Sequence, residues 1–177
     1  MISRCADADA RQICGVINAA ARAYVGVIPT DFWHEPYMSF EELRSEIDDG
    51  VSFVGYQEQG ELIGVMGSQD VQDVTLIRHA YVRPEHQARG VGHALLTHVL
   101  SGTSRPVLVG TWTSAIWAIR FYERHGFTAT SPDKARCLLE RYWSVPEGQI
   151  EVSSVLIGPG GAPTEPFSTV SSSASTF

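Results

Sequence analysis

Two kinds of hydrophobic pattern alternate along the chain. Short segments rich in β-branched and aromatic residues predict strands at residues 2–5, 51–57, 61–68, 75–82, 106–112 and 150–157. Segments with apolar residues three or four positions apart predict helices at residues 7–24, 39–50, 91–100, 115–127 and 131–142. Helices interleaved with strands in this way indicate an α/β domain with helices against both faces of a mixed sheet.

Turn and cap residues support these boundaries. Ser39 and Glu42 form a capping box at the start of the second helix, and Gln59-Gly60 predicts a hairpin turn. Residues 158–177 are rich in Gly and Pro, then in Ser and Thr, and contain few apolar residues. We therefore expect one domain at residues 1–157, followed by a disordered tail at residues 158–177.

The segment after strand 75–82 predicts an anion site. Arg83-Pro84 ends the strand, and Gln87-Ala88-Arg89-Gly90-Val91-Gly92 leads into the next helix. Unpaired amides at a helix N-terminus carry partial positive charge, and glycine lets a phosphate approach the backbone closely. Two glycines at a helix start also occur as plain turn residues, and the Walker and Rossmann patterns are absent, so the loop alone leaves both interpretations open.

A second block, at residues 115–127, follows the next predicted strand. Together the two blocks resemble the GNAT superfamily of acetyl-CoA-dependent N-acetyltransferases over about residues 1–157. The family's pyrophosphate loop, Gln/Arg-x-x-Gly-x-Gly/Ala, is matched by Gln87, Gly90 and Gly92. Its later signature, Asn-x-x-Ala-x-x-x-Tyr-x-x-x-Gly-Phe, is matched by Ala118, Tyr122, Gly126 and Phe127, whereas the Asn position holds Ala115.

The resemblance implies a mixed, mostly antiparallel sheet and acetyl-CoA as cofactor. The two central strands, here residues 75–82 and 106–112, splay apart in the family to admit the pantetheine arm. The implied cofactor contacts are Tyr81, Val82, Gln87, Ala88, Arg89, Gly90, Val91, Gly92, His93, Ala115 and Ala118. The backbone amide of Val82 is expected on the acetyl carbonyl, and Arg89 can add a charge near the pyrophosphate. Ala115 lacks the hydrogen bond that the family Asn makes, and Thr113 or Ser114 is a candidate substitute.

Moving the acetyl group directly to a primary amine requires a base for the amine and a proton for the departing thiolate. Tyr122 matches the family tyrosine near the sulfur, although its helical stripe also fits a core aromatic. His79 is a candidate base, and its alternative is a satisfied histidine packed against a helix. Strand alternation puts His79 on one side with Thr75 and Tyr81, unless a bulge disturbs that parity.

A second cluster lies in the connection at residues 26–39. Trp33, His34, Glu35 and Tyr37 can hold a cationic amine by cation–π contact and charge pairing, with Glu35 a further candidate base. The same residues can instead fix the loop to the core, and both interpretations stay open. Trp112 can complete an aromatic acceptor pocket or fill the core.

Composition narrows the remaining choices. The net charge is -7 over 177 residues, which argues against nucleic acid as a partner. Three cysteines without paired spacing indicate neither a disulfide framework nor a metal site. With no signal peptide and no membrane-spanning run in the pattern, we expect a cytoplasmic enzyme, with a small-molecule or peptide amine as acceptor and a homodimer left open. The rival classes are a non-catalytic acyl-CoA-binding sensor or partner domain and a phosphate-binding protein unrelated to CoA.

Overall fold

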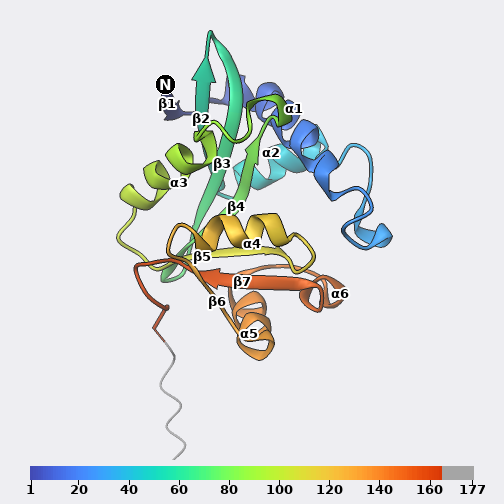
Figure 1. Ribbon diagram of the computed structural model, residues 1–177, viewed down its shortest axis with the longest axis vertical. Coiled ribbons are helices and arrows are strands. Elements are labelled where there is room, and N and C mark those ends of the chain that lie inside the picture. Colours follow the sequence, from blue (N-terminus) through green and yellow to red (C-terminus); the bar gives the residue numbers. More distant parts are fainter. Residues whose placement is uncertain (165–177) are drawn as a thin grey trace, which may run out of the picture.

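The computed structural model describes residues 1–164. Within these residues the chain forms a seven-stranded sheet with the strand order β1-β2-β3-β4-β5-β7-β6 (Figure 1). The strands are β1 (Ile2–Arg4), β2 (Ser52–Glu58), β3 (Glu61–Val71), β4 (Val74–Val82), β5 (Val107–Trp112), β6 (Thr128–Ala129) and β7 (Ser153–Ile157). Among these strands, β4 and β5 run parallel and the other neighbours are antiparallel. The predicted mixed, mostly antiparallel sheet is confirmed.

Helices cover both faces of this sheet. They are α1 (Ala10–Ala21), α2 (Phe40–Asp48), α3 (Val91–Ser101), α4 (Ile116–Glu123), α5 (Pro132–Tyr142) and α6 (Glu147–Ile150). Buried residues of α3 and α4 share one core cluster with Ile77 and Val109. Buried residues of α1 and α2 pack in a second cluster, and those of α5 pack in a third with Leu76 and Leu108. Because neighbouring strand residues point to opposite faces, α5 lies on the face opposite α3 and α4.

Two C-terminal segments differ from the predictions. The strand expected at residues 150–157 begins at Ser153, because Ile150 ends the short helix α6 that follows Pro146. Residues 158–164, expected to begin a disordered tail, remain in contact with the domain. Gly158 donates to the Val107 carbonyl at 2.8 Å, and Arg141 donates to the Thr164 carbonyl at 3.3 Å. The rest of the predicted tail lies outside the described residues, so the boundary at 157 stays a prediction.

The centre of the sheet is open between β4 and β5. These strands pair over only three positions, from Thr75 with Val107 to Ile77 with Val109. Beyond that point residues 78–82 of β4 have no partner in β5 within the described part of the chain. This confirms the splayed central strands that the family resemblance implied.

A β-bulge in β4 changes which side chains share a face. Gly67 of β3 pairs with His79, but the next residue, Ser68, pairs with Ile77, so Arg78 is the extra residue. One extra residue reverses the alternation of side chains beyond it. His79 therefore lies on the face of α1 and α2, where its ring is 5.4 Å from that of Phe53. The bulge named as the exception in the sequence analysis is present, so His79 does not share a face with Thr75, because Thr75 precedes the bulge and His79 follows it.

Candidate active site

The opening between β4 and β5 leads into a cavity of about 1110 Å³. Residues from the predicted cofactor loop, from β4, from α4 and from the connection at residues 26–39 all line it. Of the site residues predicted from the sequence, all lie along the cavity except Trp33, Glu35, Arg89 and Ala115. The structure therefore brings most of the predicted cofactor and acceptor residues to one place.

The cofactor loop has the backbone geometry of an anion cradle. Ala88 and Gly90 both have left-handed backbone, with φ of 58° and 81°, and Gly90 is the N-cap of α3. The first turn of α3 contains no acidic residue. Gly64 on β3 lets this helix end approach the sheet, because a Cβ there would lie 2.7 Å from Val91. The loop thus presents free amides and the positive end of a helix dipole at the rim of the cavity.

Backbone donors continue from this loop along β4. The Arg83 amide donates to the Ile63 carbonyl on β3 at 2.9 Å. Because amide direction alternates along a strand, the amides of Val82 and Ala80 point to the other side, toward β5. There the Val82 carbonyl accepts a hydrogen bond from the Gln87 side chain at 3.1 Å. The unpaired edge of β4 therefore offers the amides of Ala80 and Val82 to a molecule in the opening.

Tyr122 reaches the cavity from α4. Its side chain is buried, and its ring packs against Phe121 and Phe127 at centroid distances of 5.1 and 5.2 Å. No hydrogen bond to its hydroxyl occurs among the described residues, although Tyr122 lines the cavity. Burial, followed by the effect of Tyr24, raises the pKa of Tyr122 well above its ordinary value. The group is therefore a neutral phenol with a free O–H, suited to donating to a thiolate.

Ala115, at the family Asn position, is fully buried as the N-cap of α4. Its methyl group belongs to an apolar cluster with Ile28 and Trp112. The suggested substitutes do not line the cavity: Ser114 is exposed, and the Thr113 hydroxyl bonds that of Ser154 at 2.9 Å. A packed methyl group thus stands where the family has an amide.

His79 is held by a carboxylate that sequence reasoning missed. Its Nε2 forms a short hydrogen bond to Glu46 Oε2 on α2, and Arg78 Nη2 lies 3.7 Å from Glu46 Oε1. If the imidazole is neutral, this bond requires Nε2–H and leaves the lone pair on Nδ1. Both His79 and Glu46 line the cavity. No local pattern could have found Glu46, since it lies 33 residues from His79 and meets it only through the bulge.

This arrangement determines the charge of Glu46. Desolvation by burial raises its pKa, but the hydrogen bond from His79 and the charge of Arg78 oppose burial, and the net pKa is lowered. A carboxylate with a lowered folded-state pKa stabilises the fold above its unfolded pKa of about 4.3 and loses that contribution as pH falls through the folded value.

We expect Glu46→Gln to lower the melting temperature near pH 7 and to have progressively less effect below about pH 4. The reason is that the wild-type protein then also loses its carboxylate charge. Thermal melts of both proteins from pH 7 to 3 test this. Glu41→Gln is the control, since Glu41 is exposed on the same helix and forms no ion pair among the described residues. A difference in melting temperature that is constant across this range would contradict the assignment.

One wall of the cavity, which we call the aromatic wall, is formed by Tyr24, Tyr37, Tyr81 and Trp112. The Tyr81 hydroxyl interacts with the hydroxyls of Tyr24 and Tyr37, and Tyr37 accepts a hydrogen bond from Trp112 Nε1 at 3.4 Å. Burial raises the pKa of all three phenols, that of Tyr24 to about 12. These groups are therefore neutral. Tyr24 was not among the predicted site residues, because its helical spacing matched the core stripe of the first helix.

The other residues of the predicted acceptor cluster have different positions. Trp33 stacks on Tyr37 at 5.6 Å from behind the cavity wall, and the His34 ring pairs with the Pro36 carbonyl at 2.6 Å. Glu35 is exposed and does not line the cavity. Both interpretations of this connection therefore hold in part: Tyr37 and His34 border the cavity, and Trp33 supports Tyr37.

Comparison with known proteins agrees with this site. Residues 8–138 match the model of the acetyltransferase (GNAT) domain, so the chain belongs to the GNAT acetyltransferase family. Comparison with curated protein sequences gives no match.

Solved structures show the same fold. PaiA N-acetyltransferase from Thermoplasma acidophilum, solved with coenzyme A, superposes with a TM-score of 0.66 at 17% identity, over 89% of this chain and 97% of that one. The ribosomal-protein-S18-alanine N-acetyltransferase from Escherichia coli superposes with a TM-score of 0.64 at 18% identity, over 94% of this chain and 97% of that one. A GNAT acetyltransferase from Brucella melitensis, solved with acetyl-CoA, superposes with a TM-score of 0.56 at 18% identity, over 72% of this chain and 82% of that one.

Proposed function

We propose that this protein transfers the acetyl group of acetyl-CoA directly to a primary amine on a small molecule. The observation that carries the proposal is one cavity bordered by an anion-binding loop, an unpaired strand edge and a free phenol. Two of the similar structures were solved with coenzyme A or acetyl-CoA, which supports the same cofactor here.

The residues divide the reaction between them. The amides of residues 88–93 hold the pyrophosphate, and the amide of Val82, with that of Ala80, donates to the thioester carbonyl as negative charge develops there. His79 accepts the proton that the amine loses, at Nδ1, while Glu46 fixes its tautomer. The Tyr122 hydroxyl donates to the sulfur as the carbon–sulfur bond breaks.

The proposed acceptor site is the aromatic wall. The Glu46 carboxylate, which also lines the cavity, is paired with Arg78 and hydrogen-bonded to His79. The neutral hydroxyls of Tyr24, Tyr37 and Tyr81 can each donate or accept a hydrogen bond. An aromatic surface with neutral donors favours an amine on an apolar or aromatic body over a polycation.

A non-catalytic acyl-CoA-binding domain is the second candidate, favoured by the buried Ala115 and by the absence of a carboxylate on β4. Both candidates bind acetyl-CoA, but only the enzyme releases free CoA when an amine is added. The described residues contain no helix long and apolar enough to cross a bilayer. A cytoplasmic location and a homodimer stay predictions.

The test combines cofactor binding with turnover. We expect wild-type protein to bind acetyl-CoA by calorimetry and to release CoA with 2-phenylethylamine faster than with spermidine or a lysine peptide. Gly90→Val should weaken binding at least about tenfold, because valine cannot readily adopt the left-handed backbone of the loop.

Gly50→Val is the matched control, since Gly50 also has positive φ and open space around it but lies after α2. Unchanged affinity in a folded Gly90→Val variant would contradict the cofactor site. Binding without turnover for any amine would favour the sensor. Faster turnover of spermidine or the peptide would overturn only the acceptor class.

A further inference from the structure

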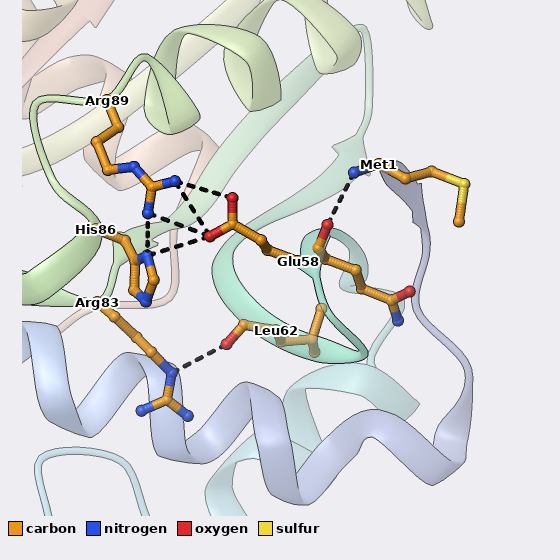
Figure 2. A network of polar contacts seen from close by, with 7 residues as sticks. Met1, Glu58, Leu62, Arg83, His86 and Arg89 are labelled. Atoms are coloured by element: carbon orange, nitrogen blue, oxygen red, sulfur yellow. Dashed lines mark hydrogen bonds and ion pairs between the residues drawn. The ribbon is translucent and has the colours of Figure 1, made fainter.

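Arg89, predicted to face the pyrophosphate, instead pairs with the hairpin that joins β2 and β3. Its Nη2 lies 2.9 Å from Glu58 Oε1, and its Nη1 lies 3.2 Å from Glu58 Oε2. Figure 2 shows the two side chains facing each other, with His86 beside them. His86 Nδ1 accepts a further hydrogen bond from Arg89 Nη1 at 2.6 Å. The guanidinium is therefore held by Glu58 and His86, and of these three residues only His86 lines the cavity.

This pair lies next to a strained position in the cofactor loop. Ala88 has φ of 58°, a left-handed conformation that costs an L-residue more than it costs glycine. Backbone in such a conformation persists when its surroundings hold it in place. Free of restraint, an alanine there would relax toward the right-handed or extended regions and turn the loop amides away.

The residues on both sides of Ala88 are tied down. Before it, Gln87 donates to the Val82 carbonyl at 3.1 Å. After it, Arg89 forms its two-pronged contact with Glu58. One restraint therefore joins the loop to β4 and the other joins it to the end of β2, with the strained residue between them.

The anchor at Glu58 is itself fixed and charged. The N-terminal ammonium of Met1 bonds the carbonyl of Gln57, the residue before it, at 2.8 Å (Figure 2). The hydrogen bond from Arg89, and then the charges of Arg89 and the N-terminus, lower the pKa of Glu58 despite some desolvation. The carboxylate is thus ionised at neutral pH, and the contact is a charge-assisted, two-pronged pair.

We infer that Glu58 is a positioning residue for acetyl-CoA, although it does not line the cavity. Through Arg89 it keeps Ala88 in the left-handed conformation in which the amides of residues 88–93 converge on the pyrophosphate. The inference rests on the proposed function for the identity of the ligand. It assigns Arg89 to holding the loop, in place of the direct phosphate contact expected from the sequence.

The experiment measures acetyl-CoA affinity in Glu58→Gln. We expect the Kd and the KM for acetyl-CoA to rise about fivefold, with kcat and the KM for the amine within twofold of wild type. The control is Glu61→Gln, because Glu61 lies opposite Glu58 in the β2–β3 ladder and forms no ion pair among the described residues. Glu61→Gln should change neither the Kd nor the KM for acetyl-CoA.

Two further variants separate positioning from a general structural effect. In the Arg89→Gln background, Glu58→Gln should raise the Kd for acetyl-CoA little further, because the contact between the two side chains is already lost. In the Ala88→Gly background its effect should also shrink, since glycine adopts the left-handed conformation without strain.

Three outcomes would overturn the inference while acetyl-CoA still binds the wild-type protein. They are an unchanged Kd in Glu58→Gln, equal effects in all backgrounds, or a lower Kd, which would mean that released Arg89 contacts the phosphate. Absence of acetyl-CoA binding in the wild-type protein would instead refute the proposed function.

Discussion

Tyr122→Phe is expected to lower kcat by about a hundred- to ten-thousandfold, with little change in the affinity for acetyl-CoA. That range is typical for loss of a general acid or base. Phenylalanine keeps the ring that packs against Phe121 and Phe127, and the hydroxyl has no hydrogen bond among the described residues. The variant should therefore melt near the wild-type temperature. Steady-state kinetics with the best amine, together with calorimetry, measure both quantities.

Tyr142→Phe provides the control for this result. Tyr142 is also a buried tyrosine, but its hydroxyl donates to Asp73 at 2.8 Å and does not line the cavity. Its replacement should lower the melting temperature and leave kcat nearly unchanged. Normal turnover in Tyr122→Phe would show that the thiolate leaves without help from the phenol.

His79→Ala is expected to lower kcat by about a hundredfold or more and to remove the acidic limb of the pH–rate profile. A base works only in its neutral form, so wild-type activity should fall as acid protonates the imidazole. Without the imidazole, that protonation no longer controls the rate. The measurement is kcat and kcat/KM across pH for the two proteins and for Glu46→Gln.

The three proteins should differ in a defined way. Glu46→Gln keeps the imidazole but weakens its orientation, so it should retain an acidic limb at a lower rate. His98→Ala, an exposed histidine on α3 that does not line the cavity, should leave the profile unchanged. If His79→Ala raises only the KM for the amine and retains the acidic limb, His79 binds the acceptor and another group is the base.

The parts of the site that could be predicted are those encoded by neighbouring residues. The glycines at 90 and 92 predicted a turn that leads into α3, because left-handed backbone and helix entry are local properties. The match at Tyr122 likewise placed a phenol on the helix that borders the cavity. Strand 75–82 was found at nearly its true bounds.

The parts that could not be predicted depend on pairing between distant segments. The bulge at Arg78 arises from the pairing of β4 with β3. It places His79 on the face of the sheet where Glu46 lies. Arg89 carries a positive charge within the predicted anion site, so the sequence favoured a contact with phosphate. Its partner Glu58 lies 31 residues away on a hairpin whose position requires the folded sheet.

The short ladder between β4 and β5 leaves part of the sheet without strand pairing at its centre. Three paired positions join its two parts, and beyond them no strand of residues 1–164 pairs with this edge of β4. A pantetheine arm in that opening would serve as the missing strand. Its binding energy then adds to the folding free energy, by about 2.7 kcal/mol when the free ligand is at a hundred times its Kd. In a cell, the lifetime of the folded protein would therefore follow the supply of its own acyl donor.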